Sequence, residues 1–121
     1  MIERAEFDKI VAVYSKHGWI LRRVLVKAES WNSLGLSEFP LSEDVEIDRS
    51  DIDAAWFSRP PKAGGVAWEI RHLSIVPYAL VEKIDEFGDD FQGKLAAVEV
   101  RLREAVGAAK RLDKVIATRS N

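Results

Sequence analysis

Five residues near the middle of the chain could form a binding site on two neighbouring strands. Asp53, Phe57 and Arg59 occupy odd-numbered positions of residues 52–59, and Glu69 and Arg71 occupy odd-numbered positions of residues 66–73. Alternate residues of a strand share a face, so pairing the two segments brings these side chains together. A carboxylate beside guanidinium groups stays ionised and can organise an anion. The pattern predicts a site for a carboxylate- or phosphate-bearing partner, with solvated cross-strand ion pairs as the simpler interpretation.

Few other side chains indicate chemistry. His72 follows Ile70 at the end of an apolar face, where it could be a general base or a structural histidine bonded to the backbone. Trp31, in a long acidic connection, could be a lid over a pocket or an anchor at an interface. The chain contains no cysteine and two histidines, and it has no nucleotide-binding loop, nucleophile elbow or metal-ligand spacing. We therefore expect no catalytic residue, metal ion or cofactor; a non-enzymatic role is favoured, although enzymatic activity stays open.

A β-hairpin must position the candidate cluster. Residues 52–59 and 66–73 alternate apolar and polar side chains on either side of a proline- and glycine-rich turn at 60–65. We predict that Trp56 lies opposite Trp68. The apolar face then carries Ile52, Trp56, Val66, Trp68 and Ile70, while Asp53, Phe57, Arg59, Glu69 and Arg71 face solvent.

The remaining segments predict an α+β domain spanning residues 1–121. Residues 3–17 have helical apolar spacing and end before Gly18, and residues 19–28 are rich in aromatic and β-branched residues, as in a strand. The 29–50 connection is long, with a short edge strand possible at 45–47. Residues 78–85 favour a fourth strand, although a helix is possible within 74–85. We expect an antiparallel sheet of three to four strands.

A long amphipathic helix is predicted at residues 89–117. Its apolar positions step by four and three residues, as in a coiled-coil seam: Phe91, Leu95, Val98, Leu102, Ala105, Ala109, Leu112 and Ile116. We expect this helix and the N-terminal helix to pack on one face of the sheet. Because the seam is longer than a small sheet requires, we also predict a homodimer through residues 91–116.

Composition excludes several classes of protein. A charged N-terminus without an apolar run argues against a signal peptide, and no stretch is apolar enough to span a membrane. The net charge of −2 gives no general attraction to nucleic acid. Residues 37–53 carry a net charge of −6, and residues 94–121 one of +4. We expect a cytoplasmic location, no nucleic acid partner and no membrane.

Two functions fit these observations. The favoured one is a small dimeric protein-interaction module, acting as a chaperone, an immunity protein or a regulator, that binds a protein partner through the acidic connection or the exposed sheet face. The alternative is a binder of small anions or metabolites, or an enzyme, with a pocket under the 29–50 loop that uses Arg59, Arg71, Glu69 or His72.

Overall fold

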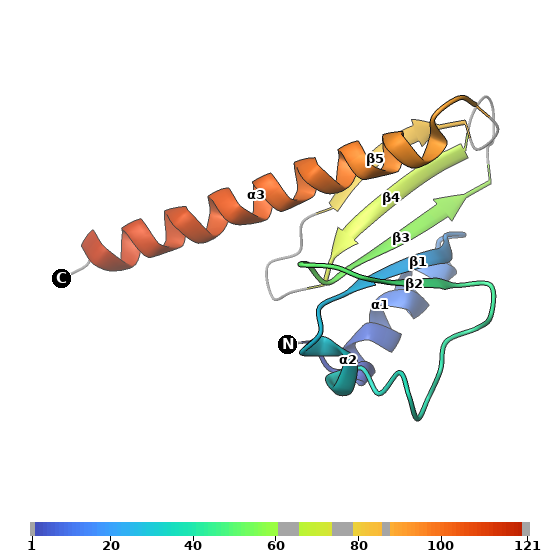
Figure 1. The fold of residues 1–121 in the computed structure, drawn as a ribbon, viewed down its shortest axis with the longest axis horizontal. Helices are drawn as coiled ribbons and strands as arrows, with labels where there is room; N and C mark the ends of the chain where they lie inside the picture. The colour runs from blue at the N-terminus through green and yellow to red at the C-terminus, as the bar shows by residue number, and fades with distance from the viewer. Residues whose placement is uncertain (1, 61–65, 74–78, 86–87, 120–121) are drawn as a thin grey trace.

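The computed structural model describes residues 2–60, 66–73, 79–85 and 88–119, with side chains in the last segment described as far as residue 108. The chain is an α+β structure with a five-stranded sheet between helices (Figure 1). In chain order its elements are α1 (Arg4–Lys16), β1 (Ile20–Val26), α2 (Ser30–Ser33), β2 (Glu46–Arg49), β3 (Ala54–Arg59), β4 (Val66–His72), β5 (Ala79–Ile84) and α3 (Phe91–Arg119).

The sheet is mixed, with strand order β2-β1-β3-β4-β5. The prediction of three to four antiparallel strands is wrong in number and direction, because β2 pairs with β1 in parallel while the other pairs are antiparallel. Parallel neighbours require a crossover connection of a dozen residues or more. The long 29–45 connection supplies that crossover, which gives its length a structural reason.

The hairpin of β3 and β4 confirms the predicted separation of faces but not the predicted pairs. Trp56 lies opposite Ile70, and Trp68 lies opposite Ser58. The shift is two residues, so every side chain keeps its face. Trp56 and Trp68 are both buried, and their rings meet edge to face at 6.1 Å.

Residues 79–84 form the predicted additional strand, β5, which pairs with β4 at the edge of the sheet. Residues 74–78, the rest of the ambiguous segment, lie outside the described residues. The expected helix stop is confirmed at Gly18, which follows the last residues of α1 with φ +85°. Glycine adopts this left-handed conformation without the steric penalty that other residues carry.

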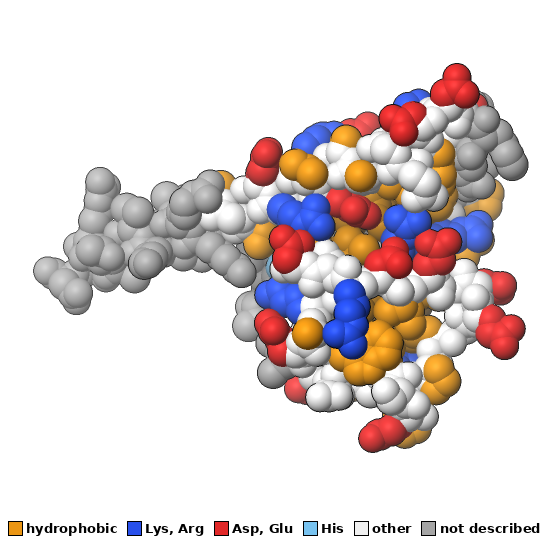
Figure 2. Space-filling view, in the orientation of Figure 1, with side chains coloured by type: hydrophobic (Ala, Val, Ile, Leu, Met, Phe, Trp, Pro, Cys, Tyr) orange, Lys and Arg blue, Asp and Glu red, His pale blue; other side chains and the backbone are white. Residues whose placement is uncertain are grey.

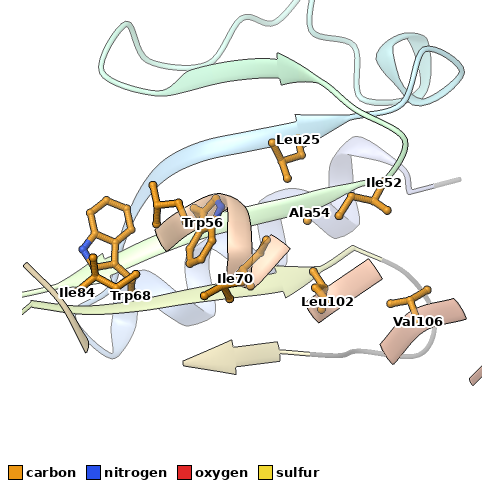
Figure 3. Packing of buried hydrophobic residues seen from close by; sticks show 11 residues of the cluster. Leu25, Ile52, Ala54, Trp56, Trp68, Ile70, Ile84, Leu102 and Val106 are labelled. Atoms are coloured by element: carbon orange, nitrogen blue, oxygen red, sulfur yellow. The ribbon is translucent and has the colours of Figure 1, made fainter. Parts of the chain in front are cut away.

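The two long helices lie on opposite faces of the sheet, contrary to the prediction that both pack on one face. On the α3 face, Leu95, Val98, Leu102 and Val106 pack in one cluster with Trp56, Trp68 and other residues of the sheet; Figure 3 labels Leu102 and Val106 among them. On the α1 face, Phe7 of α1 packs in a second cluster with Val24, Val26, Ala55 and Phe57. The sheet is apolar on both faces at β1 and β3, so each face requires a cover.

The apolar residues in the first part of α3 pack against the sheet of the same chain. Leu95 is 2% exposed and Leu102 is 0% exposed against the sheet. The predicted homodimer seam is therefore already occupied over this stretch. The second half of the helix runs past the edge of the sheet (Figure 1). Within the described residues, no helix combines the length and apolar character that a membrane span requires.

Candidate functional site

The structure separates Asp53 from the other residues of the predicted site. This carboxylate is 6% exposed just before β3. Its Oδ1 accepts a hydrogen bond from the Lys27 backbone N–H at 2.8 Å, and its Oδ2 accepts one from the Ser30 hydroxyl at 2.5 Å. Asp53 therefore fixes the turn between β1 and α2 instead of facing a ligand.

Phe57 and Arg59 contact aromatic residues around α1. Phe57 is 0% exposed and stacks on the Tyr14 ring, with centroids 4.0 Å apart. The guanidinium of Arg59 lies 4.8 Å from the centroid of Trp19. The predicted solvent-exposed face is thus covered by α1 at β3, and Arg59 is the member of the pair that remains exposed.

Glu69 and Arg71 lie half-buried on β4, beside Tyr14. The Tyr14 hydroxyl donates to the Glu69 carboxylate. Burial, this hydrogen bond and the negative charge of Glu69 raise the pKa of Tyr14 above its ordinary value, and the charge of Arg71 opposes the rise. The structure brings this part of the predicted cluster together, but around a tyrosine of α1.

Trp31 also holds local structure. It lies partly buried in α2, its Nε1 donates to the Ser37 hydroxyl at 3.0 Å, and the Arg49 guanidinium lies 5.8 Å from its ring. His72 is 5% exposed on the α3 face and has an interaction partner. Across the residues that the structure describes, no three acidic or histidine side chains gather as metal ligands.

The 34–45 loop, between α2 and β2, is held in place from α1. The Arg4 guanidinium donates to the carbonyls of Leu34 at 3.0 Å and Phe39 at 2.6 Å, and the Phe39 N–H donates to the Gly35 carbonyl at 2.8 Å. Although its backbone is fixed, the Phe39 side chain is 65% exposed. The loop therefore presents an aromatic side chain to solvent in a defined position.

The acidic residues of 37–53 divide into paired and unpaired groups. Glu46 and Asp48 bind Arg23, Asp51 binds Arg103, and Asp53 is buried. Glu38, Glu43 and Asp44 are exposed and form no ion pair with any described residue. In Figure 2, acidic and apolar side chains line the rim where this loop runs. Among the described residues, these three unpaired acidic side chains therefore belong to the same loop as Phe39, and Glu38 is its neighbour in sequence.

A β-bulge in β1 creates a second candidate site, on the α3 face. Leu21 pairs with Phe57 and Arg23 pairs with Trp56, so Arg22 is an extra residue in its strand. Both arginines reach the α3 face. Arg22 Nε donates to Ser58 at 2.8 Å, and Arg23 donates to Gln92 of α3 at 3.0 Å. Strict alternation puts adjacent residues on opposite faces of a strand, so sequence reasoning missed this site; two adjacent arginines in an otherwise apolar strand were the available signal.

These arginines line a surface cavity of about 190 Å³. Its apolar wall comes from Trp56, Trp68, Phe91 and Leu95, and its polar wall from Arg22, Arg23, Asp44, Glu46 and Gln92. None of the residues predicted to line a pocket is among them. The cavity does border the acidic loop, through Asp44.

Most polar groups around the cavity already have partners. Arg23 contacts Glu46 at 2.9 Å and Glu99 at 3.9 Å, and Trp56 Nε1 donates to Glu99 at 2.8 Å. Two donors have no partner among the described residues. Trp68 Nε1 is buried and has no hydrogen-bond partner among the described residues. Within the same part of the chain, the terminal nitrogens of Arg22 make no hydrogen bond.

Comparison with known proteins adds no relative: no family model matches the chain, and no curated protein or solved structure is significantly similar to it.

Proposed function

We propose that this chain is a non-enzymatic protein-interaction module that docks a basic protein partner through the 34–45 loop, with Phe39 as the anchor. The supporting observation is the 65% exposure of Phe39 on a backbone held by Arg4. Aromatic side chains are enriched in the centres of protein interfaces. A loop that is already ordered loses little conformational entropy when it binds, which favours affinity.

The acidic residues in the same loop as Phe39 favour a partner with a positively charged surface. Glu38 precedes Phe39, Glu43 and Asp44 follow it in the same loop, and none of the three forms an ion pair with a described residue. Complementary charge at the rim of an interface accelerates association and selects the partner, and salt weakens its effect. We therefore infer a partner that presents an apolar pocket bordered by lysine or arginine side chains.

Paired affinity capture tests this function. Wild type and Phe39→Ala would be used as baits in extracts of the source cell, with Val13→Ala as the matched control. Val13 is 57% exposed on α1, so its truncation also removes an exposed apolar side chain. We expect a basic protein that wild type and Val13→Ala retain and Phe39→Ala loses. The proposal fails if every protein bound by wild type is retained equally by Phe39→Ala.

We also propose that the chain forms a homodimer, through the part of α3 beyond the sheet. The support is the continued helix to Arg119 and the apolar spacing of residues 109, 112 and 116. An isolated helical segment of this length is marginal in water, so a second copy would stabilise it. In sedimentation, Leu112→Lys should yield a monomer and Asp113→Lys, off the seam, should not. A monomeric wild type or a dimeric Leu112→Lys variant would contradict the interface.

A further inference from the structure

The cavity beside Arg22 contains two charged side chains of opposite sign, Arg22 and Asp44, that form no ion pair with any described residue. Arg23 and Glu46 neutralise each other across the wall. The remaining charges are Arg22, with its terminal nitrogens unbonded, and Asp44, which has no ion pair among the described residues. Among the described residues, one open cation and one open anion therefore line the same small cavity, beside the Trp68 side chain.

We propose that this cavity binds a free α-amino acid with a flat apolar side chain. The carboxylate of the ligand binds Arg22, and its ammonium binds Asp44. Guanidinium groups match carboxylates through two parallel hydrogen bonds, which a single ammonium could not form. The terminal nitrogens of Arg22, which make no hydrogen bond to any described residue, supply those donors, because Ser58 occupies only Nε.

Charge balance favours a zwitterion over a simple anion. Two arginines and two carboxylates line the cavity, so its formal charge is zero. An anion at Arg22 would meet the uncompensated carboxylate of Asp44, and a cation at Asp44 would meet Arg22. A ligand that carries both charges forms a charge-assisted hydrogen bond with each of these two exposed groups.

The apolar wall and the volume define the rest of the ligand. Trp56 and Trp68 meet edge to face, and the Phe91 ring lies 5.2 Å from Trp68. Trp56 is 0% exposed and Trp68 6% exposed, so the half-buried Phe91 ring offers the accessible aromatic surface, against which a flat apolar group can pack by stacked or edge-to-face contacts. The volume of about 190 Å³ equals roughly six water molecules at about 30 Å³ each, which suits a single amino acid.

Three matched ligands test the proposal: L-phenylalanine, 3-phenylpropionate, which lacks the ammonium, and 2-phenylethylamine, which lacks the carboxylate. Binding would be followed through the four indole N–H signals in ¹⁵N-correlated NMR spectra of the full chain. Trp56 and Trp68 belong to the cavity, whereas Trp19 and Trp31 pack on the α1 face and serve as internal references. We expect phenylalanine to move the Trp68 signal and to bind at least tenfold more tightly than either analogue.

Two variants assign the contacts. Arg22→Gln should weaken phenylalanine at least tenfold and leave phenylethylamine unchanged or improved, and Asp44→Asn should weaken phenylalanine but not phenylpropionate. Arg59→Gln, on the α1 face, and Phe39→Ala should bind phenylalanine as wild type does, so this test does not depend on the proposed protein interface. Equal affinity for all three ligands, an unmoved Trp68 signal at saturating phenylalanine, or full binding by Arg22→Gln would overturn the proposal.

Discussion

Replacing Asp53 by alanine is expected to lower the free energy of unfolding by about 3 kcal/mol. The carboxylate accepts one hydrogen bond from the Lys27 N–H at 2.8 Å and one from the Ser30 hydroxyl at 2.5 Å. A hydrogen bond to a charged group contributes about 1.5–3 kcal/mol, and a buried donor left without an acceptor carries its own penalty. Ser30 is 0% exposed, so the substitution leaves a hydroxyl donor in a buried position without its acceptor.

The matched control is Asp51→Ala, two residues earlier. Asp51 also binds a partner, Arg103 at 2.7 Å, but its side chain is 72% exposed. Solvent screens such a pair, and we expect a loss within about 0.5 kcal/mol. The comparison therefore separates burial from the mere presence of a carboxylate.

Urea unfolding followed by tryptophan fluorescence measures both variants, and a melting curve gives an independent estimate. For a chain of this size, 3 kcal/mol corresponds to a decrease in Tm of about 10 °C. A loss below about 1 kcal/mol for Asp53→Ala would refute the assignment of this carboxylate as a structural group. Equal losses in both variants would refute it as well.

Three further predictions concern other elements. Leu102→Ala, in the core between α3 and the sheet, should lower the free energy of unfolding by about 2–5 kcal/mol, independently of protein concentration. Val100→Ala, at a position that is 47% exposed, should change it by no more than about 0.5 kcal/mol, and denaturant unfolding at several protein concentrations checks both variants. Because the pKa of Tyr14 is raised in the folded chain, the unfolded chain loses the tyrosine proton at lower pH than the folded chain does. The contribution of Tyr14 to stability is therefore complete below about pH 10 and declines above it. The variant Tyr14→Phe should show a smaller decrease in Tm at alkaline pH than wild type. Gly18→Ala should destabilise by about 1 kcal/mol because φ is +85°, and Gly18→Asn by less, as thermal unfolding would report.

Periodicity predicted the elements that repeat regularly. The hairpin and the burial of Trp56 and Trp68 followed from two-residue alternation, and α3 followed from its spacing of three and four residues. These patterns are local, since each depends on one segment facing one surface. The homodimer predicted from the same helical spacing remains a prediction, because that spacing alone does not say whether a sheet or a second helix covers it.

The candidate sites depended on features that local patterns do not encode. One extra residue at Arg22 reverses the alternation of β1, so the two arginines share a face. Phe57 is covered because α1 packs on that face of the sheet. Asp53 is buried where it accepts hydrogen bonds from the turn between β1 and α2. Each is a contact between segments far apart in sequence, which is why the predicted polar cluster is only partly assembled.

The most direct test of the proposed function is the affinity of the captured partner for wild type and Phe39→Ala, measured by titration at low and high salt. Truncating an anchor residue costs about 2 kcal/mol or more, so we predict an affinity loss of about 30-fold or greater, and a weakening of wild-type binding as salt screens the acidic loop. An affinity for Phe39→Ala within about twofold of wild type would contradict the account.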